Sequence, residues 1–457
     1  MLKIGFAEGV ITPPGRVSLQ GQYHIRVSAE PPAEDILAVG MAVSNGRENL
    51  FWAACDLCHI PQALIDGVLA ALEGVLPVTR ENLILHATHI HTGPFVVDAV
   101  SSLNGNHMIP ADATPAEECR RAVTEGIVHA LKNAYAARED AFLETTVARV
   151  RTGVSRRIHY RSGETVMYGG TATSEFLRSE SRDGGPIQLA YARRSADGAL
   201  MGVIADVPCT AQVVENKEYI SPDYMGAARA EVRRTLGVPL FGVIGASGDL
   251  SPHVLLGRYP GMPDDRDEAG RLALGRRVAE AVAEHAEDHL RRAEDFRHLY
   301  RSVRLPLWQS TPEERDAALR RLDAWRARYG AELDYEKMRA EGFDDAFGLS
   351  TALAQAERCR ETQEYFRADV HAFRFGRAAF ITNPFELYTE YADRMRAALP
   401  GVQIFDVELA GDGEAYLPTR RAVRGGGYSA AIFSGLTGPE GGEILTQESI
   451  EMLKSLY

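Results

Sequence analysis

A strand–helix–strand pattern constrains the fold of this chain more than any other feature of its sequence. Residues 49–57, NLFWAACDL, form an apolar run typical of a buried strand. Pro61 then opens a helical segment whose apolar residues share one face: Leu64, Val68, Leu69 and Leu72. A second apolar run follows and leads into HATHIHTGP at 86–94. Because such a crossover usually makes its two strands parallel neighbours, the pattern predicts an α/β fold.

The second predicted strand carries three histidines. If the segment stays extended, His89 and His91 project together and His86 faces the other way, with Thr92-Gly93-Pro94 ending the strand. Asp56, at the carboxyl end of the first strand, would lie near the pair, at the edge where α/β sheets bind ligands. Two imidazoles at a strand end suit a metal site or an acid–base pair. A hydrogen-bonded structural pair fits the spacing equally well.

Composition and charge exclude several classes of partner. The chain has 457 residues, of which 50 are basic and 63 acidic, giving a net charge of −13. This balance argues against a general nucleic-acid binder and against an anionic membrane surface. No run of about 18 uncharged apolar residues occurs, and the N-terminus lacks the pattern of a secretion signal. We therefore expect a cytoplasmic protein that acts on a small molecule, with a homo-oligomer as the usual assembly.

The five cysteines are odd in number and scattered, which favours reduced thiols over a disulfide framework. Cys55 and Cys58 form a C-x-x-C motif, but this motif straddles the predicted end of a strand and no second one exists. A thioredoxin-type motif would open a helix instead, and a four-cysteine zinc site needs a second pair. Both residues are therefore predicted to be buried structural cysteines.

The remaining sequence continues the α/β pattern and adds a helical stretch. The predicted elements are a helix at 115–136 capped by Thr114, short strands across 143–220, a strand at 239–247 and a helix at 267–292. Thr311-Pro312-Glu313-Glu314 is a typical helix start, and Gly330 a typical helix end. The α/β pattern returns from 369. We predict a single domain, 1–457, with a helical insertion or lid at 310–368.

Four segments resemble, in order, the neutral/alkaline non-lysosomal ceramidase family. They are GFAEGVITPPG (5–15), ATHIHTGP (87–94), GASGDLSPH (245–253) and NPFELYTEYADRMR (383–396). The resemblance implies a ceramidase catalytic-domain-like fold, a mixed β-sheet core flanked by helices. It also implies zinc-dependent amidase chemistry, with two His, one Glu and one Tyr as zinc ligands. The chain is too short for the immunoglobulin-like C-terminal domain of full-length ceramidases, so it resembles a distant, single-domain member.

Carried over residue by residue, the resemblance implies a metal site. His89 would be a zinc ligand and His91 a neighbouring catalytic histidine. Glu386 matches the metal-binding glutamate, and Tyr416, in AYLPTRR, resembles the zinc-bound tyrosine. Taken without the resemblance, Asn383-Pro384-x-Glu386 is also a helix-capping pattern.

Three further residues are implied to be catalytic. Ser251 in GDLSP matches a serine beside the zinc, and Tyr428 in GGGYSA is similar to a second active-site tyrosine. Arg156 in SRRIHYRSG resembles a family arginine, with Arg157 as the less close match.

The sequence departs from the family at the second zinc histidine. ISPDYMG (220–226) resembles the segment that follows that histidine, but the preceding ADVPCTAQVVEN contains none. Cys209 lies at about the expected position, and a thiolate is a competent zinc ligand. His253, which stands where the family has asparagine, is a further candidate.

The sequence thus predicts a zinc-dependent hydrolase of a small or medium polar substrate, an amide or an acylated sugar-derived compound rather than ceramide. Water activated by the metal would be the nucleophile. Two alternatives stay open. One keeps the fold with a different metal and a lyase, isomerase or glycoside-type reaction, and the other is a metal-free binding scaffold.

Overall fold

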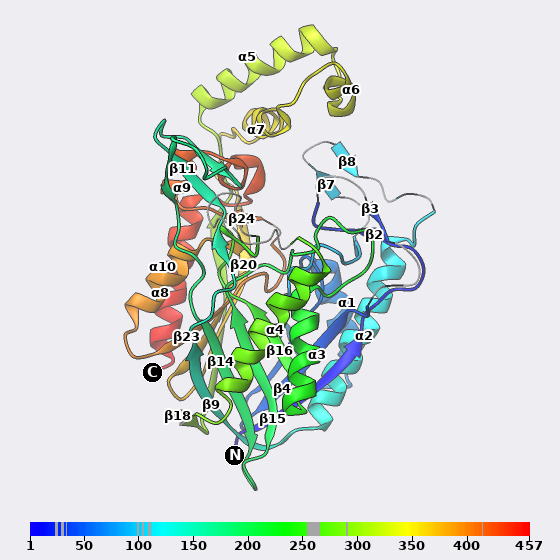
Figure 1. Cartoon of the computed structure of the whole chain (residues 1–457), viewed down its shortest axis with the longest axis vertical. Helices are drawn as coiled ribbons and strands as arrows, with labels where there is room; N and C mark the ends of the chain where they lie inside the picture. Colours follow the sequence, from blue (N-terminus) through cyan, green and yellow to red (C-terminus); the bar gives the residue numbers. More distant parts are fainter. Residues whose placement is uncertain are drawn as a thin grey trace.

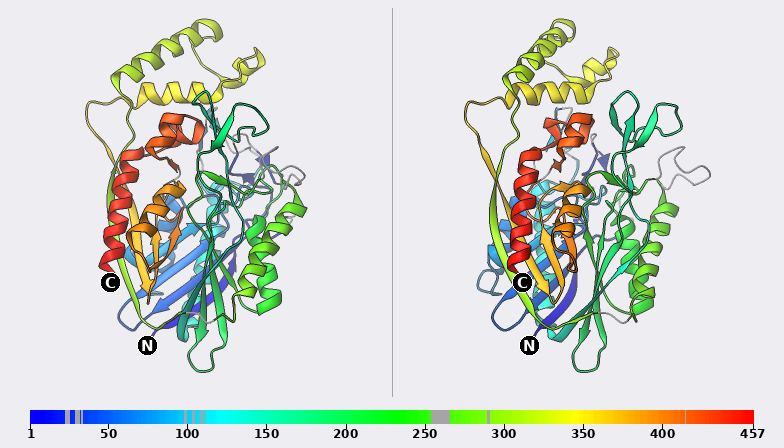
Figure 2. Two further views of the ribbon diagram at one scale, coloured as in Figure 1. Left: turned by 60° about the vertical axis from the view of Figure 1, so that its left-hand side comes forward. Right: turned by 90° about the vertical axis from the view of Figure 1, so that its left-hand side faces the viewer.

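The computed structural model of the chain describes residues 1–22, 26–28, 32, 34–97, 100–102, 105–107, 110, 112–253, 266–288, 291–413 and 415–457. Its elements form four layers, in which two sheets stack face to face and helices cover both outer faces (Figures 1 and 2).

The larger sheet runs in the order β16-β15-β14-β9-β1-β4-β5-β6, with β18 also paired to β9. Its strands are β1 (Lys3–Val10), β4 (Leu37–Ser44), β5 (Asn49–Cys55), β6 (Leu83–Ala87), β9 (Glu139–Ala148), β14 (Ile187–Arg194), β15 (Leu200–Val207), β16 (Leu240–Ile244) and β18 (Arg291–Ala293). The pairs β5–β6 and β15–β16 are parallel and the other pairs antiparallel. The sheet is therefore mixed, and the predicted parallel crossover from 49 to 87 is confirmed.

Helices cover one face of this sheet. They are α1 (Gln62–Leu72), α2 (Ala116–Ala136), α3 (Asp223–Leu236) and α4 (Glu268–Glu284). Phe51 on β5 packs toward this layer, with Leu64, Val123 and Val278 in the same core cluster. The next residue, Trp52, belongs to the core on the opposite face, because successive strand residues point to opposite sides.

The second sheet covers that opposite face in the order β19-β20-β21-β23. Its strands are β19 (Phe296–Pro306), β20 (Tyr365–Phe375), β21 (Ala378–Thr382) and β23 (Gln403–Val407). Trp52 meets Phe373 and Phe380 edge to face, at ring-centroid distances of 5.3 and 5.8 Å. Helices α8 (Thr389–Ala398) and α10 (Pro439–Ser455) close the outer side of this sheet.

Three helices interrupt the antiparallel pair β19–β20. They are α5 (Pro312–Tyr329), α6 (Tyr335–Ala340) and α7 (Ala346–Glu357), and they lie at the end of the molecule opposite the N-terminus (Figures 1 and 2). Their own small core contains Leu322, Met338, Phe343 and Leu349. The predicted start of α5 is confirmed, since Thr311 and Glu314 form a capping box. The predicted helical stretch ends earlier than 368, because β20 begins at Tyr365.

Short strands and turns at the same end complete the structure. The strands are β2 (Ser18–Leu19), β3 (Arg26–Val27), β7 (Val100–Ser102), β8 (Gly105–His107), β10 (Val154–Ser155), β11 (Arg157–Tyr160), β12 (Thr165–Met167), β13 (Phe176–Ser179), β17 (Leu250–Ser251), β22 (Glu386–Leu387) and β24 (Tyr416–Leu417). The remaining helices are α9 (Arg420–Gly425) and the 3-10 turns η1 (Arg80–Asn82), η2 (Tyr428–Ala430) and η3 (Ile432–Ser434). Within the described residues, no helix has the length and apolar character needed to cross a membrane.

Three predicted boundaries are wrong. The strand with the histidines ends at Ala87 and does not reach Thr92-Gly93-Pro94, because His89 adopts a left-handed conformation with φ 58°. The helix predicted at 267–292 ends at Glu284, and Arg291–Ala293 instead pair with β9. The Thr114 hydroxyl does not cap α2, since it donates a hydrogen bond to the Pro14 carbonyl.

Candidate metal centre

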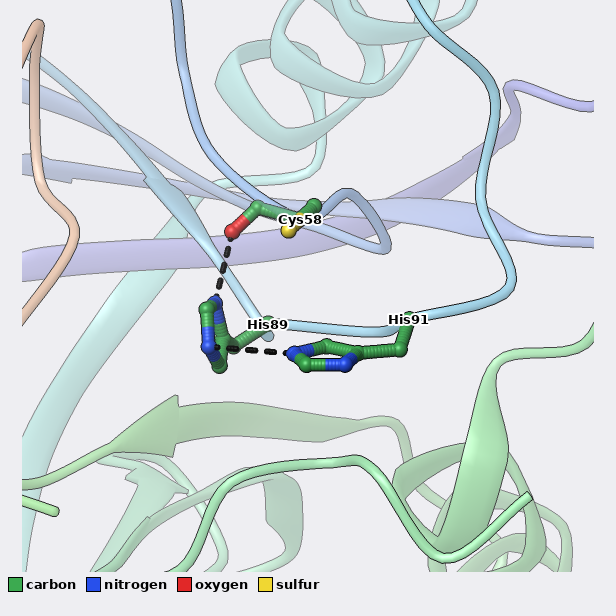
Figure 3. Close-up of side chains that lie close together, drawn as sticks. All are labelled: Cys58, His89 and His91. Atoms are coloured by element: carbon green, nitrogen blue, oxygen red, sulfur yellow. Dashed lines mark hydrogen bonds between the residues drawn. The ribbon is translucent and has the colours of Figure 1, made fainter. Parts of the chain in front are cut away.

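The two histidines after β6 meet in a tight turn (Figure 3). The His89 Nδ1 atom lies 2.8 Å from the Cys58 carbonyl oxygen, so it donates its hydrogen there, and in the neutral ring Nε2 is the acceptor. The His91 Nε2 atom lies 3.4 Å from the His89 Nε2 atom. The predicted convergence of the two imidazoles is therefore confirmed, although the left-handed turn produces it and strand alternation does not.

The second nitrogen of each ring also lies near an oxygen. The His91 Nδ1 atom lies 3.3 Å from the Glu215 carboxylate, as the His89 Nδ1 atom lies near the Cys58 carbonyl. Metal-binding histidines usually hold their second ring nitrogen in this way. Two donors on one tetrahedral ion with bonds of about 2.1 Å lie roughly 3.4 Å apart, which is the spacing of the two Nε2 atoms.

The thiol of Cys58 joins the two histidines. The donor atoms of Cys58, His89 and His91 all lie within 4.8 Å of one another, and no other such group of His, Cys, Asp and Glu occurs in the described part of the chain. Burial raises the pKa of the Cys58 thiol, but hydrogen bonds from His59 and His89 outweigh burial and lower it to about 6. Cys58 is buried, as predicted, and the sequence did not predict that its sulfur lies beside the two imidazoles.

Cys209 is not part of this group. It lies fully buried in the core between the larger sheet and the helices, with its sulfur near the Thr210 carbonyl. Burial raises its pKa far above the usual range of a thiol. Cys209 therefore lacks the thiolate character that Cys58 has.

Glu386 faces His89 from β22. Its Oε2 atom lies 3.5 Å from the His89 Nε2 atom and is buried without a hydrogen bond among the described residues. Burial alone would raise the pKa of this carboxyl, but the nearby His89 and Arg156 charges outweigh burial and lower it. An ionised carboxylate thus lies directly beside the two imidazoles.

Arg156 connects Glu386 to the two predicted tyrosines. Its guanidinium lies 3.6 Å from the Glu386 Oε2 atom and donates a hydrogen bond of 3.2 Å to the Tyr416 hydroxyl. Tyr416 pairs directly with Glu386 across β22–β24, and the Tyr416 and Tyr428 rings lie 5.9 Å apart. Burial raises the pKa of the Tyr428 hydroxyl, so this group stays protonated at neutral pH.

Glu215 was not predicted from the sequence. Besides His91, its carboxylate lies 3.6 Å from the Nδ1 atom of His253, a fully buried residue. Burial raises the pKa of Glu215, but the hydrogen bond with His91 and the His91 and His253 charges outweigh burial and lower it to about 2. Its only sequence signal is a lone charge after Val213-Val214, in the segment that should have carried the missing family histidine.

Of three other predicted residues, Ser251 and Asp56 contact neighbours of this centre and Arg157 does not. The Ser251 hydroxyl, at the end of β17, accepts a hydrogen bond from the His253 backbone N–H. Asp56 pairs with Arg229 and accepts a hydrogen bond from Thr88, the residue before His89, so it anchors the histidine turn. Arg157 pairs with Glu180 on a separate buried network.

Comparisons with known proteins support the fold alone. No protein-family model and no curated protein sequence matches the chain. Among solved structures, the neutral ceramidase from Pseudomonas aeruginosa is similar over the whole chain and 74% of its own length, with a TM-score of 0.67 and 20% identity. A ceramidase complexed with C2 is similar over the whole chain and 75% of its own length, with a TM-score of 0.68 and 18% identity. The chain therefore has the fold of the neutral ceramidases, as its four sequence segments predicted.

Proposed function

We propose that this chain is a metal-dependent hydrolase that cleaves an amide or acyl bond of a small polar molecule. One observation carries the proposal. The Nε2 atoms of His89 and His91 lie 3.4 Å apart beside the Cys58 thiol, and the second nitrogen of each ring lies within 3.3 Å of an oxygen. The resemblance to neutral ceramidases in sequence and fold is consistent with this reaction class.

Cys58, His89 and His91 would hold the metal. A sulfur and two imidazole nitrogens suit zinc, and catalytic zinc sites commonly have three protein ligands and one open position. A zinc ion there would lower the pKa of bound water from about 15.7 to about 7 and would polarise a carbonyl group. The Cys58 carbonyl fixes the tautomer and the orientation of His89, and the Glu215 carboxylate, 3.3 Å from the His91 Nδ1 atom, would favour a proton on that atom and so leave the His91 Nε2 atom for the metal.

Glu386 is the base in this proposal. Its Oε2 atom is buried without a hydrogen bond among the described residues and lies 3.5 Å from the His89 Nε2 atom, where it could take a proton from the attacking water and pass it to the leaving group. The resemblance implied the opposite roles, with Glu386 as ligand and His91 as catalyst. We exchange them because His91, and not Glu386, joins the group of three donors.

Arg156, Tyr416 and Tyr428 would stabilise the oxyanion that forms at the attacked carbonyl. Arg156 contacts both Glu386 and Tyr416, Tyr428 lies beside Tyr416, and all three carry N–H or O–H donors. Ser251 would help orient the substrate from the end of β17. The small polar substrate, the cytoplasmic location and the homo-oligomeric state stay predictions from the sequence, which has no apolar segment suited to a lipid surface.

Hydrolysis in ¹⁸O-labelled water tests this function. A panel of acylated amino sugars and short polar amides would be incubated with zinc-loaded protein, and products would be analysed by mass spectrometry. We expect one labelled oxygen in the acid product. Glu386→Gln, which keeps the shape but not the base, should lower the rate by about 10²- to 10⁴-fold.

The same experiment separates the alternatives. A product without solvent oxygen would contradict hydrolysis and favour a lyase or isomerase. Full activity in Glu386→Gln would exclude Glu386 as the base. Absence of turnover across the panel, with the protein folded and loaded with metal, would favour a binding scaffold.

A further inference from the structure

A pocket of about 620 Å³ lies between α7 and the segment that carries Tyr428. Phe347 and Thr351 line it from α7, and Tyr428 and Phe433 line it from the body of the protein. Residues of α5 and α7 thus form one wall of this pocket.

Three aromatic rings stack along this pocket. The Phe347 and Tyr428 rings lie 5.1 Å apart with 17° between their planes, and the Phe347 and Phe433 rings lie 6.1 Å apart with 7° between theirs. Phe347 nevertheless remains 41% exposed. An exposed aromatic ring at the mouth of a pocket provides a flat apolar surface for the face of a ligand ring.

The pocket adjoins the candidate metal centre through Tyr428. The Tyr428 ring lies 5.9 Å from Tyr416, whose hydroxyl accepts a hydrogen bond from Arg156. Arg156 in turn lies 3.6 Å from Glu386. Tyr428 therefore belongs both to the lining of the pocket and to the group of side chains that extends through Tyr416 and Arg156 to Glu386.

The polar lining of the pocket is acidic. Glu164, Glu314 and Asp345 line it, and its described lining contains no Lys, Arg or His. Glu314 and Asp345 each accept a backbone N–H at the start of their own helix with one oxygen. Because a carboxylate has about four acceptor sites, both retain capacity for hydroxyl groups. This lining disfavours phosphates and carboxylates and suits an uncharged, hydroxyl-rich ligand.

We propose that this pocket binds a neutral sugar ring, with one face of the ring against Phe347 and its hydroxyls on the acidic lining. The stacked rings match the C–H face of a pyranose, and the carboxylates match its O–H groups. The proposal deepens the proposed function, because it makes the substrate an acylated sugar. Binding of the sugar ring itself requires no metal.

Saturation-transfer NMR tests the subsite with free methyl pyranosides of glucose, galactose, mannose and N-acetylglucosamine. Glucuronate serves as the anionic probe and octanamide as the acyl probe. We expect millimolar binding of at least one neutral pyranoside, with the strongest saturation on the ring C–H protons. Phe347→Ala should weaken this binding by about tenfold, and Phe347→Tyr should retain it.

Leu353→Ala is the matched control, because Leu353 lies on the same helix with 38% exposure and does not line the pocket. It should leave sugar binding unchanged. Three results would overturn the proposal: no binding of any neutral pyranoside, equal loss in Leu353→Ala and Phe347→Ala, or preferential binding of octanamide or glucuronate.

The metal content of the same samples separates the two claims. Sugar binding that persists in chelated protein supports the subsite even if no metal binds to Cys58, His89 and His91. Metal binding without sugar binding would contradict the subsite and leave the metal centre intact.

Discussion

His86 lies three residues before His89 but has a purely structural environment. It is fully buried, its Nδ1 atom accepts a hydrogen bond of 2.8 Å from the Trp52 indole, and its Nε2 atom donates one of 2.9 Å to the Gly242 carbonyl. These two bonds require the neutral ring. The prediction that His86 faces away from His89 and His91 is consistent with these contacts.

Acid should therefore destabilise the protein through His86. Burial lowers its pKa from 6.5 to about 4, so between these values the unfolded chain binds a proton that the folded chain excludes. The contribution of neutral His86 to the free energy of unfolding is fully present above pH 6.5 and is lost as the pH falls toward 4. At pH 4.5, which is two pH units below 6.5, the free energy of unfolding is lower by about 2.5 kcal/mol. Each pH unit contributes about 1.36 kcal/mol, and partial protonation of His86 in the folded protein reduces the sum slightly.

Urea unfolding at pH 7 and pH 4.5 measures this effect against His86→Gln, whose amide can keep both hydrogen bonds without titrating. The free energy of unfolding should fall by about 2.5 kcal/mol more in wild type than in the variant. An equal fall in both proteins would show that His86 does not exclude the proton.

The residues of the site were only partly predictable from the sequence. His89, His91, Glu386, Arg156, Tyr416 and Tyr428 were implied by short segments that resemble a family, and the structure brings them close together. Cys58 and Glu215 were not assigned, because their proximity depends on how the loops after β5 and β15 fold back over the sheet edge. Spacing along the chain contains no information on such contacts.

Among the elements, α2 lies unusually close to the strands beneath it. A methyl group added at Gly126 on α2 would overlap the Val10 carbonyl, and one added at Gly9 on β1 would overlap the Gly126 carbonyl. The two glycines therefore set the distance between this helix and the sheet.

Gly126→Ala should destabilise the protein by about 1–3 kcal/mol, because the backbone must shift to admit the methyl group. Gly67→Ala on α1 is the matched control, since its methyl group would meet only Thr124, at 3.4 Å. That substitution should be neutral or should stabilise by up to about 1 kcal/mol through helix propensity. Thermal unfolding of both variants checks the pair, and equal midpoints would contradict this account of the packing.

Elements were predicted well where local pattern determines them. The strand at 49–57, helix α1 and the capping box of α5 follow from apolar periodicity and cap residues within a few positions. The end of β6 and the short strand β18 were missed. A left-handed residue such as His89 has no turn signal in its sequence, and β18 forms only because β9 lies beside it.

At the scale of the whole molecule, the layered fold places the candidate centre at one edge of both sheets. His89 and His91 follow β6 of the larger sheet, and Glu386 follows β21 of the smaller one. The centre therefore depends on the stacking of two sheets that are distant in sequence. The predicted mixed sheet flanked by helices is confirmed, whereas the face-to-face stacking of a second sheet was not predicted.

Metal content measured by plasma mass spectrometry tests the central claim most directly. Wild type would be compared with Cys58→Ala, His91→Ala, Glu386→Gln and Cys209→Ala, each resupplied with zinc and checked for folding by circular dichroism. We predict about one zinc ion per chain in wild type, Cys209→Ala and Glu386→Gln, and loss of zinc in Cys58→Ala and His91→Ala. Zinc that is retained in Cys58→Ala and lost in Cys209→Ala, or absent from all folded samples, would contradict a metal centre formed by Cys58, His89 and His91.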